Sequence, residues 1–496
     1  MEAVCAARAF AEGCDRKRLS TVAHEKVDFY PAAFQRRVEE LLPLVGSKVC
    51  DGLPGSAAGA GTRRFREASK TGPAPLTGLG LFRIGEDGRL YFTSKAEHYH
   101  LSVGHSFPGY RLLENARALG IPNCTHNNTR GHITRLLEEE LVAAANGLRR
   151  QESERLRAVL DATDPRILNR VINLETGSLV AEAAVKMALT RFYRFEPGGS
   201  DPKYSGRTPV FLVIGDLEGG TGANYHGTTI ATQLMRGLWP ELAAHLEQSQ
   251  TLVVRPVKIN DNADFSAVMK QWDQGRYKVA AFFHEIVLMN YGAVRLEESF
   301  LQSAHELCRE RDVLTVVDEI QSCVWSPELF LFREYGLSPD IVAVGKGFPG
   351  GEYPAARVLL NGSADALQQF GALVTNGQEE LASLAYLVTI EYARAHAAVT
   401  REVGDYYESE LRSLARRYPR LIDKIEGRRH LASLFFHQMD GVKRFVSLLN
   451  EGGIDISVQS YKPSFPPSCL TKLPLTVNAR SVDFLVGKMD SVLRKL

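Results

Sequence analysis

Two segments of this sequence place chemically active side chains directly after short apolar runs. Residues 314–317 precede Asp318-Glu319-Ile320-Gln321, which would present a carboxylate at the end of a strand. Residues 341–344 precede Gly345-Lys346-Gly347, where the two glycines would let a ligand approach the backbone. Because ligands of open parallel sheets bind beyond the carboxyl ends of the strands, both segments are candidates for a functional site.

Lys346 is the candidate nucleophile. A lysine that is desolvated and close to other positive charge loses its proton easily and can form a Schiff base with an aldehyde. Taken alone, Gly-Lys-Gly also fits a surface lysine in a turn, and Asp318 also fits a carboxylate that caps a helix. The surrounding residues favour the chemical interpretation.

The segment that contains both residues carries the most specific pattern in the chain. Residues 317–359 read VDEIQSCVWSPELFLFREYGLSPDIVAVGKGFPGGEYPAARVL. They resemble the core signature of the class III aminotransferases, which are pyridoxal-phosphate enzymes of fold type I. The resemblance implies that Asp318 pairs with the pyridine nitrogen, that Gln321 lies near the phenolic oxygen, and that Lys346 holds the cofactor as an internal aldimine. An ionised Asp318 would keep the ring nitrogen protonated, so that the ring can withdraw electrons from a substrate carbanion.

A phosphate-bearing cofactor needs an anion site, and a turn before an alanine-rich helix offers one. Thr176, Gly177 and Ser178 open this helix, whose backbone N–H groups and dipole would bind phosphate. The turn resembles the family's Ser-Gly-Ser-Glu-Ala segment, with Leu179 where a glutamate is usual. Read alone, it also fits an ordinary N-capped helix.

Three further positions are assigned by the resemblance alone. Tyr225 lies in an aromatic-His-Gly motif and matches the ring that stacks on the pyridine face. Glu285 matches the glutamate of the family's Glu-Pro pair, with Ile286 in place of the proline. Thr375 matches the threonine that reaches the partner subunit's cofactor phosphate, although the usual Gly-Asn-Pro is missing after it. This last match implies an obligate homodimer with active sites at the interface.

The chain departs from the family where the substrate is recognised. Most members carry an arginine that grips the substrate carboxylate as a two-pronged donor, and here that position falls on Leu470. Lys472 would lie on the same face of a strand and could supply a point charge, without the planar fork. Cys323 replaces a usual glycine and is followed by Val324 and Trp325, which predicts a bulkier pocket wall. These departures suggest an unusual substrate.

Histidines near residue 100 raise the question of a metal site. Residues 103–108 resemble the family's Gly-His-x-x-Pro element, and His98 and His100 lie close by in the sequence. No acidic or cysteine partner stands at ligand spacing, so we expect no metal and assign these histidines to the substrate entrance.

A parallel sheet covered by helices must position these residues. Apolar β-branched runs alternate with helical patterns at 210–214, 251–254, 279–283, 313–317 and 341–344. After about residue 365 the pattern changes to long amphipathic helices at 381–394, 400–417 and 482–496. The resemblance implies a fold type I α/β enzyme: a mostly parallel seven-stranded sheet sandwiched by helices, with a smaller α+β C-terminal domain.

The expected organisation has four parts. Residues 1–75 form an N-terminal extension that lies outside the resemblance, and residues 76–145 contribute to the small domain and the active-site entrance. Residues 146–365 form the large cofactor-binding domain, and residues 366–496 form the small C-terminal domain. A chain of 496 residues with 44% hydrophobic and 24% charged residues can bury several cores.

Composition excludes several classes of function. The 59 basic and 58 acidic side chains give a formal charge of +1, which provides no electrostatic footprint for nucleic acid. Seven scattered cysteines without CxxC spacing argue against a disulfide framework and a zinc knuckle, and favour a reducing compartment. We find no signal core in the first thirty residues and no apolar run long enough to span a membrane. We therefore expect a cytoplasmic protein without nucleic-acid or membrane partners.

These observations predict an aminotransferase. Lys346 would hold pyridoxal 5′-phosphate, release it to a primary amine, and then move a proton between the substrate carbon and the cofactor. An amino donor and a keto or aldehyde acceptor would alternate in a ping-pong cycle. Related proteins on the same scaffold are racemases, decarboxylases or aminomutases that use the same lysine and aspartate. A third alternative is a binding or scaffold protein that has lost turnover.

Overall fold

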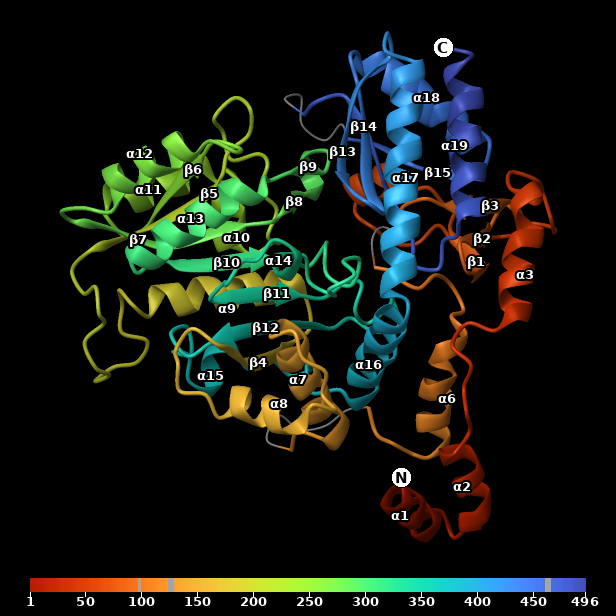
Figure 1. The fold of residues 1–496 in the computed structure, drawn as a ribbon, viewed down its shortest axis with the longest axis horizontal. Helices are drawn as coiled ribbons and strands as arrows, with labels where there is room; N and C mark the ends of the chain where they lie inside the picture. Colours follow the sequence, from red (N-terminus) through yellow and green to blue (C-terminus); the bar gives the residue numbers. More distant parts are fainter. Residues whose placement is uncertain (97–99, 124–128, 460–464) are drawn as a thin grey trace. The chain divides into compact units, whose positions relative to one another are not determined.

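The structure is a computed structural model that describes residues 1–96, 100–123, 129–459 and 465–496 (Figure 1). The chain separates into two compact units: unit 1 contains Met1–Asn115 and Ala398–Leu496, and unit 2 contains Ala116–Ala397. No helix of the described ranges is long and apolar enough to cross a membrane.

The bounds of the two units differ from the predicted domain bounds for two reasons. In unit 1, strand β3 (Leu90–Thr93) pairs in parallel with β15 (Ile454–Asp455), which joins the two ends of the chain in one sheet. In unit 2, helix α16 (Glu380–Ala395) packs on α7 (His132–Ala145) and so groups with the residues before it.

Unit 2 is built on a seven-stranded sheet with the order β4-β12-β11-β10-β7-β5-β6. These strands are β4 Leu168–Leu174, β5 Thr208–Ile214, β6 Val253–Val257, β7 Tyr277–His284, β10 Leu314–Asp318, β11 Ile341–Val344 and β12 Ala356–Asn361. Every neighbouring pair is parallel except the two pairs made by β12, which runs antiparallel to β11 and β4. The predicted mostly parallel seven-stranded sheet is confirmed.

Helices cover both faces of this sheet. Successive side chains of a strand point to opposite faces, and the two phenylalanines at the end of β7 show the consequence. Phe283 belongs to the apolar cluster beneath α9 (Gly177–Leu189), whereas Phe282 makes an edge-on contact with Phe265 of α12 (Asn262–Trp272). The remaining helices of unit 2 are α8 Ser153–Leu160, α10 Ile230–Met235, α11 Pro240–Gln248, α13 Glu298–Glu310, α14 Leu331–Glu334 and α15 Gln369–Ala372, and a two-stranded sheet joins β8 Val287–Leu288 to β9 Val294–Arg295.

Unit 1 contains two four-stranded sheets with the orders β1-β2-β3-β15 and β13-β14-β17-β16. The further strands are β1 Pro75–Leu79, β2 Phe82–Gly85, β13 Ile422–Arg428, β14 Leu431–Phe436, β16 Ser457–Gln459 and β17 Ser468–Lys472. Its helices are α1 Glu2–Glu12, α2 Arg16–Ala23, α3 Ala32–Leu41, α4 Arg63–Ala68, α17 Ala397–Arg417, α18 Met439–Glu451 and α19 Ala479–Leu493, and α6 Arg111–Ala118 spans the division between the units.

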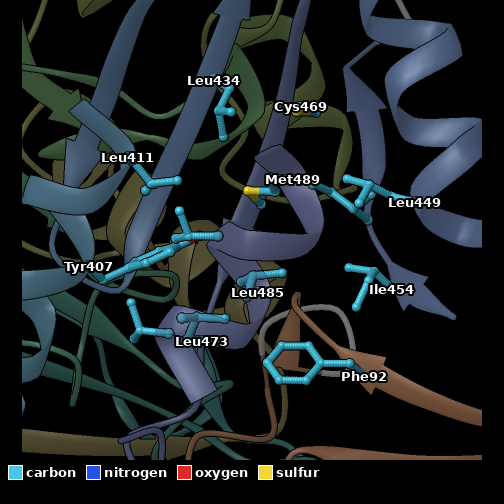
Figure 2. Packing of buried hydrophobic residues seen from close by; sticks show 14 of the residues in the cluster. Phe92, Tyr407, Leu411, Leu434, Leu449, Ile454, Cys469, Leu473, Leu485 and Met489 are labelled. Atoms are coloured by element: carbon cyan, nitrogen blue, oxygen red, sulfur yellow. The ribbon is translucent and has the colours of Figure 1, made fainter. Parts of the chain in front are cut away.

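The apolar core of unit 1 draws on both ends of the chain (Figure 2). Phe92 of β3 packs in one cluster with Leu411 of α17, Cys469 of β17 and Met489 of α19. Because side chains alternate along β17, Cys469 faces this core while Leu470 and Lys472 lie on the opposite face of the sheet.

Candidate active site

Three of the predicted site residues leave neighbouring parallel strands at their carboxyl ends. Glu285 follows β7, Asp318 ends β10, and Lys346 follows β11 after a single glycine. These strands are adjacent in the order β11-β10-β7, so the structure brings the three side chains to one edge of the sheet. We call this the cofactor edge.

Asp318 is buried, and both of its carboxylate oxygens are held. Oδ1 accepts a hydrogen bond from the backbone N–H of Ile320 at 3.0 Å, and Oδ2 lies 2.9 Å from Nδ1 of His226. A carboxylate only accepts, so Nδ1 of His226 carries the proton. Each oxygen keeps a lone pair for another donor, such as a protonated ring nitrogen.

The sequence analysis gave no role to His226. It is buried beside Asp318, and its Nε2 has no hydrogen-bond partner within the described chain. An orphaned polar atom at this depth indicates a site that the protein alone does not complete. The only sequence signal for His226 is its place directly after Tyr225.

Lys346 combines an unusual backbone with a depressed basicity. Its φ of +34° lies in the region that favours glycine. Burial lowers the pKa of the ammonium group, while Glu285, Asp318 and Cys323 act in the opposite direction. An amine that loses its proton more easily is the better nucleophile.

Glu319 fixes the loop that follows Asp318. Its two carboxylate oxygens accept hydrogen bonds from the Ser322 hydroxyl at 2.6 Å and from the Phe332 N–H at 2.5 Å. Burial raises the pKa of Glu319 to about 7 despite these bonds. The loop therefore folds back on a fully buried acid, which holds the turn that carries Gln321.

The N-terminus of α9 presents free donors. Thr176 is the N-cap, although its hydroxyl accepts from the Leu179 N–H at a long 3.5 Å. The N–H groups of Gly177 and Ser178 make no hydrogen bond to any described residue. Ser178 Oγ accepts from the Thr228 N–H at 3.1 Å, which ties the helix end to the loop that carries Tyr225. Free N–H groups at a helix N-terminus suit an anion.

Ile320 joins the helix end to the lysine turn. A Cβ added at Gly177 would lie 3.0 Å from Ile320 Cδ1, and a Cβ added at Gly345 would lie 3.0 Å from the same atom. Both glycines therefore approach one side chain closely. The anion-binding turn, the Asp318 segment and the lysine turn form a single packed assembly.

The remaining predicted residues differ in their surroundings. Tyr225 is half-buried, and the guanidinium carbon of Arg236 lies 4.7 Å from its ring centroid. Gln321 is buried in the turn after Asp318. Thr375 is exposed in the loop between α15 and α16, and makes no hydrogen bond to any described residue of its own chain.

The donor set fits pyridoxal phosphate part by part. Asp318 with His226 suits a protonated ring nitrogen, the α9 N-terminus suits the phosphate, and Lys346 suits the aldehyde. The unpartnered His226 Nε2 supports the fit, because a group bound beside Asp318 would end its isolation. Across the described ranges, no three His, Cys, Asp or Glu side chains gather where they could hold a metal ion, and His98 lies outside those ranges.

The face of β17 that points away from the core of unit 1 is buried and polar. Leu470 is paired with Ser457 of β16, whose hydroxyl accepts from Lys95 Nζ at 2.7 Å. Lys95 also lies 3.4 Å from Asp455, which receives a second cation, Arg83, at 3.0 Å. Lys472 is fully buried on the same face. We call this the β17 face.

Comparison with known proteins agrees with this picture. The family model described as Aminotransferase class-III matches residues 131–493. The chain is 30% identical over 269 residues to the diaminobutyrate–2-oxoglutarate aminotransferase of Haemophilus influenzae (51% of this chain, 55% of that protein). It is 26% identical over 371 residues to the acetylornithine aminotransferase of Agrobacterium fabrum (71% of this chain, 79% of that protein). The chain spans between 42% and 56% of the length of the first three curated relatives it matches.

Solved structures show the same fold. An aminotransferase of Bacillus anthracis aligns with a TM-score of 0.69 at 17% identity, covering 93% of this chain and 99% of that one. The fold and the family match together define a fold type I enzyme that uses pyridoxal phosphate. The chain belongs to the class III aminotransferase family.

Proposed function

We propose that this protein is a pyridoxal-phosphate-dependent aminotransferase that moves an amino group from an amino donor to a keto or aldehyde acceptor in a ping-pong cycle. The observation that carries the proposal is the packed assembly at the cofactor edge. There Ile320 contacts both the α9 turn and the lysine turn, and Asp318 lies two residues before it.

Each residue has a distinct task in this proposal. Bound pyridoxal phosphate supplies an electron sink for a substrate carbanion. The Asp318 carboxylate would pair with the protonated ring nitrogen, and His226 orients Asp318 through the 2.9 Å hydrogen bond. Thr176, Gly177 and Ser178 bind the phosphate, Tyr225 covers the ring, and Gln321 and Glu285 line the site. Lys346 holds the cofactor and, once its Nζ is free, takes the proton from the substrate carbon.

We also propose that the working form is a cytoplasmic homodimer. Thr375 is exposed and makes no hydrogen bond to the described residues of its own chain, as expected for a hydroxyl that serves the partner's phosphate. The scattered, odd number of cysteines supports a reducing compartment. Leu470 stands at the position where most family members carry an arginine for the substrate carboxylate, and we propose that this departure reflects an unusual substrate.

A single-turnover experiment tests the activity. Purified protein is loaded with pyridoxal phosphate and given amino donors one at a time, without an acceptor. An aminotransferase must release one equivalent of keto or aldehyde product per site and then stop. Continued consumption of the donor would instead indicate racemase, decarboxylase or aminomutase chemistry.

Borohydride reduction before the donor is added identifies the attachment site. We expect the cofactor on the peptide that contains Lys346, and we expect Lys346→Ala to lower turnover by at least about 10⁴-fold, because it removes both the attachment and the proton carrier. Modification of another lysine, or wild-type protein that never holds the cofactor, would refute the assignment.

A further inference from the structure

The turn that carries Lys346 has a glycine on each side, so its backbone conformation must be fixed by the packing around it. Lys346 is flanked by Gly345 and Gly347, and its own φ of +34° is sparsely populated for a residue with a side chain. Such a conformation persists only where the surrounding structure over-determines it. The packing around each glycine shows which side chains do so.

The two glycines are held by different neighbours. The carbonyl of Gly345 accepts hydrogen bonds from the Phe348 N–H at 3.0 Å and from the Cys323 thiol at 3.4 Å. At Gly347, a Cβ would lie 2.2 Å from Cζ3 of Trp325, 2.9 Å from Cη2 of the same ring and 2.9 Å from Cγ1 of Val324. The indole thus occupies the space that a side chain at residue 347 would need.

The segment that presents the indole is itself strained. Val324 has a φ of +69°, which is a steric outlier for a β-branched residue. Its N–H donates to the carbonyl of Leu329 at 2.7 Å, and Leu329 also has a positive φ of 66°. This tight turn places Trp325 in the interior with 2% of its surface exposed. Backbone strain of this kind is concentrated at active sites and ligand-binding sites.

We propose that Trp325 is a positioning residue for Lys346: its indole fills the space beside Gly347 and prevents the lysine turn from relaxing to an ordinary backbone conformation. This inference rests on the proposed function, in which Lys346 holds the cofactor. Without the indole the turn relaxes, the ammonium group moves away from the cofactor edge, and cofactor capture weakens. Val324 acts with Trp325 by fixing the direction of its side chain.

Complementary substitutions test the packing directly. Trp325→Ala opens the space, and Gly347→Ala places a methyl group into the indole. Each change alone should weaken capture of pyridoxal phosphate at Lys346 by roughly tenfold to a hundredfold, since displacements of about 1 Å at a reacting group have effects of this size. The double variant should bind more tightly than Gly347→Ala alone, because the methyl group then enters space that the indole has left. Trp325→Phe lacks the Cζ3 and Cη2 atoms that lie beside Gly347, so its capture of the cofactor should fall between that of Trp325→Ala and that of wild type.

Four measurements separate positioning from a general loss of structure. They are the affinity for pyridoxal phosphate by absorbance, the fraction fixed to Lys346 by borohydride, the pH titration of the bound cofactor's absorbance, and the thermal unfolding of the protein without cofactor. Matched controls are Trp272→Phe, whose ring stacks on Arg255 at 3.9 Å, and Gly487→Ala, where nothing lies within 4 Å of the new Cβ. Both controls should capture the cofactor as wild type does.

The outcomes distinguish this inference from the proposed function. If wild type carries the cofactor on Lys346 but Trp325→Ala and Gly347→Ala show unchanged affinity and an unchanged pH titration, Trp325 does not position the lysine. A double variant that is no better than Gly347→Ala would also overturn the inference. If Trp325→Ala does not fold, Trp325→Phe and Gly347→Ala carry the test. Wild type that never carries the cofactor on Lys346 would instead refute the proposed function.

Discussion

The cofactor edge of unit 2 and the β17 face of unit 1 are both buried and polar, yet they are built in opposite ways. At the cofactor edge, Asp318, Ile320 and Trp325 come from one short segment that leaves a single strand. On the β17 face, Lys95 bonds to Ser457, which lies 362 positions away in the sequence. The proposed cofactor chemistry therefore depends on one local segment, whereas the β17 face is held together by contacts between distant segments.

Among the variants that test this comparison, the largest expected effect comes from removing the charge of Asp318 at the cofactor edge. Asp318→Asn keeps the shape of the side chain but removes the negative charge, so the ring nitrogen loses its partner. We expect kcat to fall by about 10²–10³-fold, as for loss of a single preorganised electrostatic contact in other enzymes, while cofactor still attaches to Lys346. Steady-state kinetics and borohydride trapping provide the test. Full activity in Asp318→Asn would contradict the comparison, because the charge of Asp318 would then have no role in the reaction.

Glu319, the buried acid next to Asp318, predicts that the stability of the protein depends on pH. Its folded pKa of about 7 lies above the usual 4.5, so folding disfavours the ionised form. The stability present at low pH is lost as the pH rises from about 4.5 towards about 7, by about 3 kcal/mol in total. Glu319→Gln can keep both hydrogen bonds without this loss, so the variant should match wild type near pH 5 and exceed it at pH 8.

Denaturant unfolding of both proteins across this range checks the prediction. Ser491→Ala is the control, because this exposed side chain does not titrate and its loss should leave the difference between pH 5 and pH 8 unchanged. Parallel stability curves for wild type and Glu319→Gln would contradict the prediction, because they would show that Glu319 ionises as readily in the folded protein as in the unfolded chain.

The sequence predicts the parts of the fold that depend on local patterns and misses the parts that do not. The runs at 210–214, 279–283 and 341–344 are strands of the sheet, because continuous apolar β-branched runs are typical of strands buried on both faces. Strands β4 and β12 were not predicted. Edge strand β4 contains Asn169, Arg170 and Asn173, and β12 contains the buried Arg357, so neither reads as an apolar run.

The candidate site shows the same division. Lys346, Asp318 and the α9 turn could be proposed as site residues from the sequence because each lies next to a recognisable strand or helix end. Ile320 and Trp325 were not assigned as positioning residues, because their importance lies in contacts with glycines from other segments. Lys95 had no signal at all, since a lysine that pairs with Ser457 and Asp455 across the chain resembles any surface lysine in sequence.

An intermediate effect is expected from the β17 face. Lys95→Met keeps the apolar stem but removes the hydrogen bond to Ser457 and leaves Asp455 with Arg83 as its partner. Because Lys95 is only 8% exposed, we expect Lys95→Met to lower the free energy of unfolding by about 1–3 kcal/mol and to leave cofactor capture unchanged. Lys48→Met is the control: its pair with Asp51 is exposed, and its loss should cost no more than about 1 kcal/mol.

Thermal and denaturant unfolding measure both variants. If Lys95→Met were as stable as Lys48→Met, the long-range contacts of the β17 face would not stabilise unit 1. If Lys95→Met failed to capture the cofactor, the β17 face and the cofactor edge would not be independent of each other.

The smallest effect compares two helix N-caps, one in each unit. Asn478 caps α19 with a short bond, its Oδ1 lying 2.9 Å from the Ser481 N–H, whereas Thr176 caps α9 at 3.5 Å. Asn478→Ala should therefore cost about 1 kcal/mol of stability, and Thr176→Ala less than about 0.5 kcal/mol. Capture of pyridoxal phosphate should show the reverse order: weakened in Thr176→Ala and unchanged in Asn478→Ala.

Pyridoxal without its phosphate separates the two explanations for Thr176. If the α9 turn binds phosphate, Thr176→Ala should weaken capture of pyridoxal phosphate several-fold relative to wild type and leave capture of pyridoxal unchanged. If Thr176→Ala instead costs as much stability as Asn478→Ala and does not distinguish the two compounds, the turn is an ordinary helix cap. A long capping bond then has no functional meaning, whereas a phosphate-specific loss shows that this helix end keeps its donors for a ligand at the expense of its own stability.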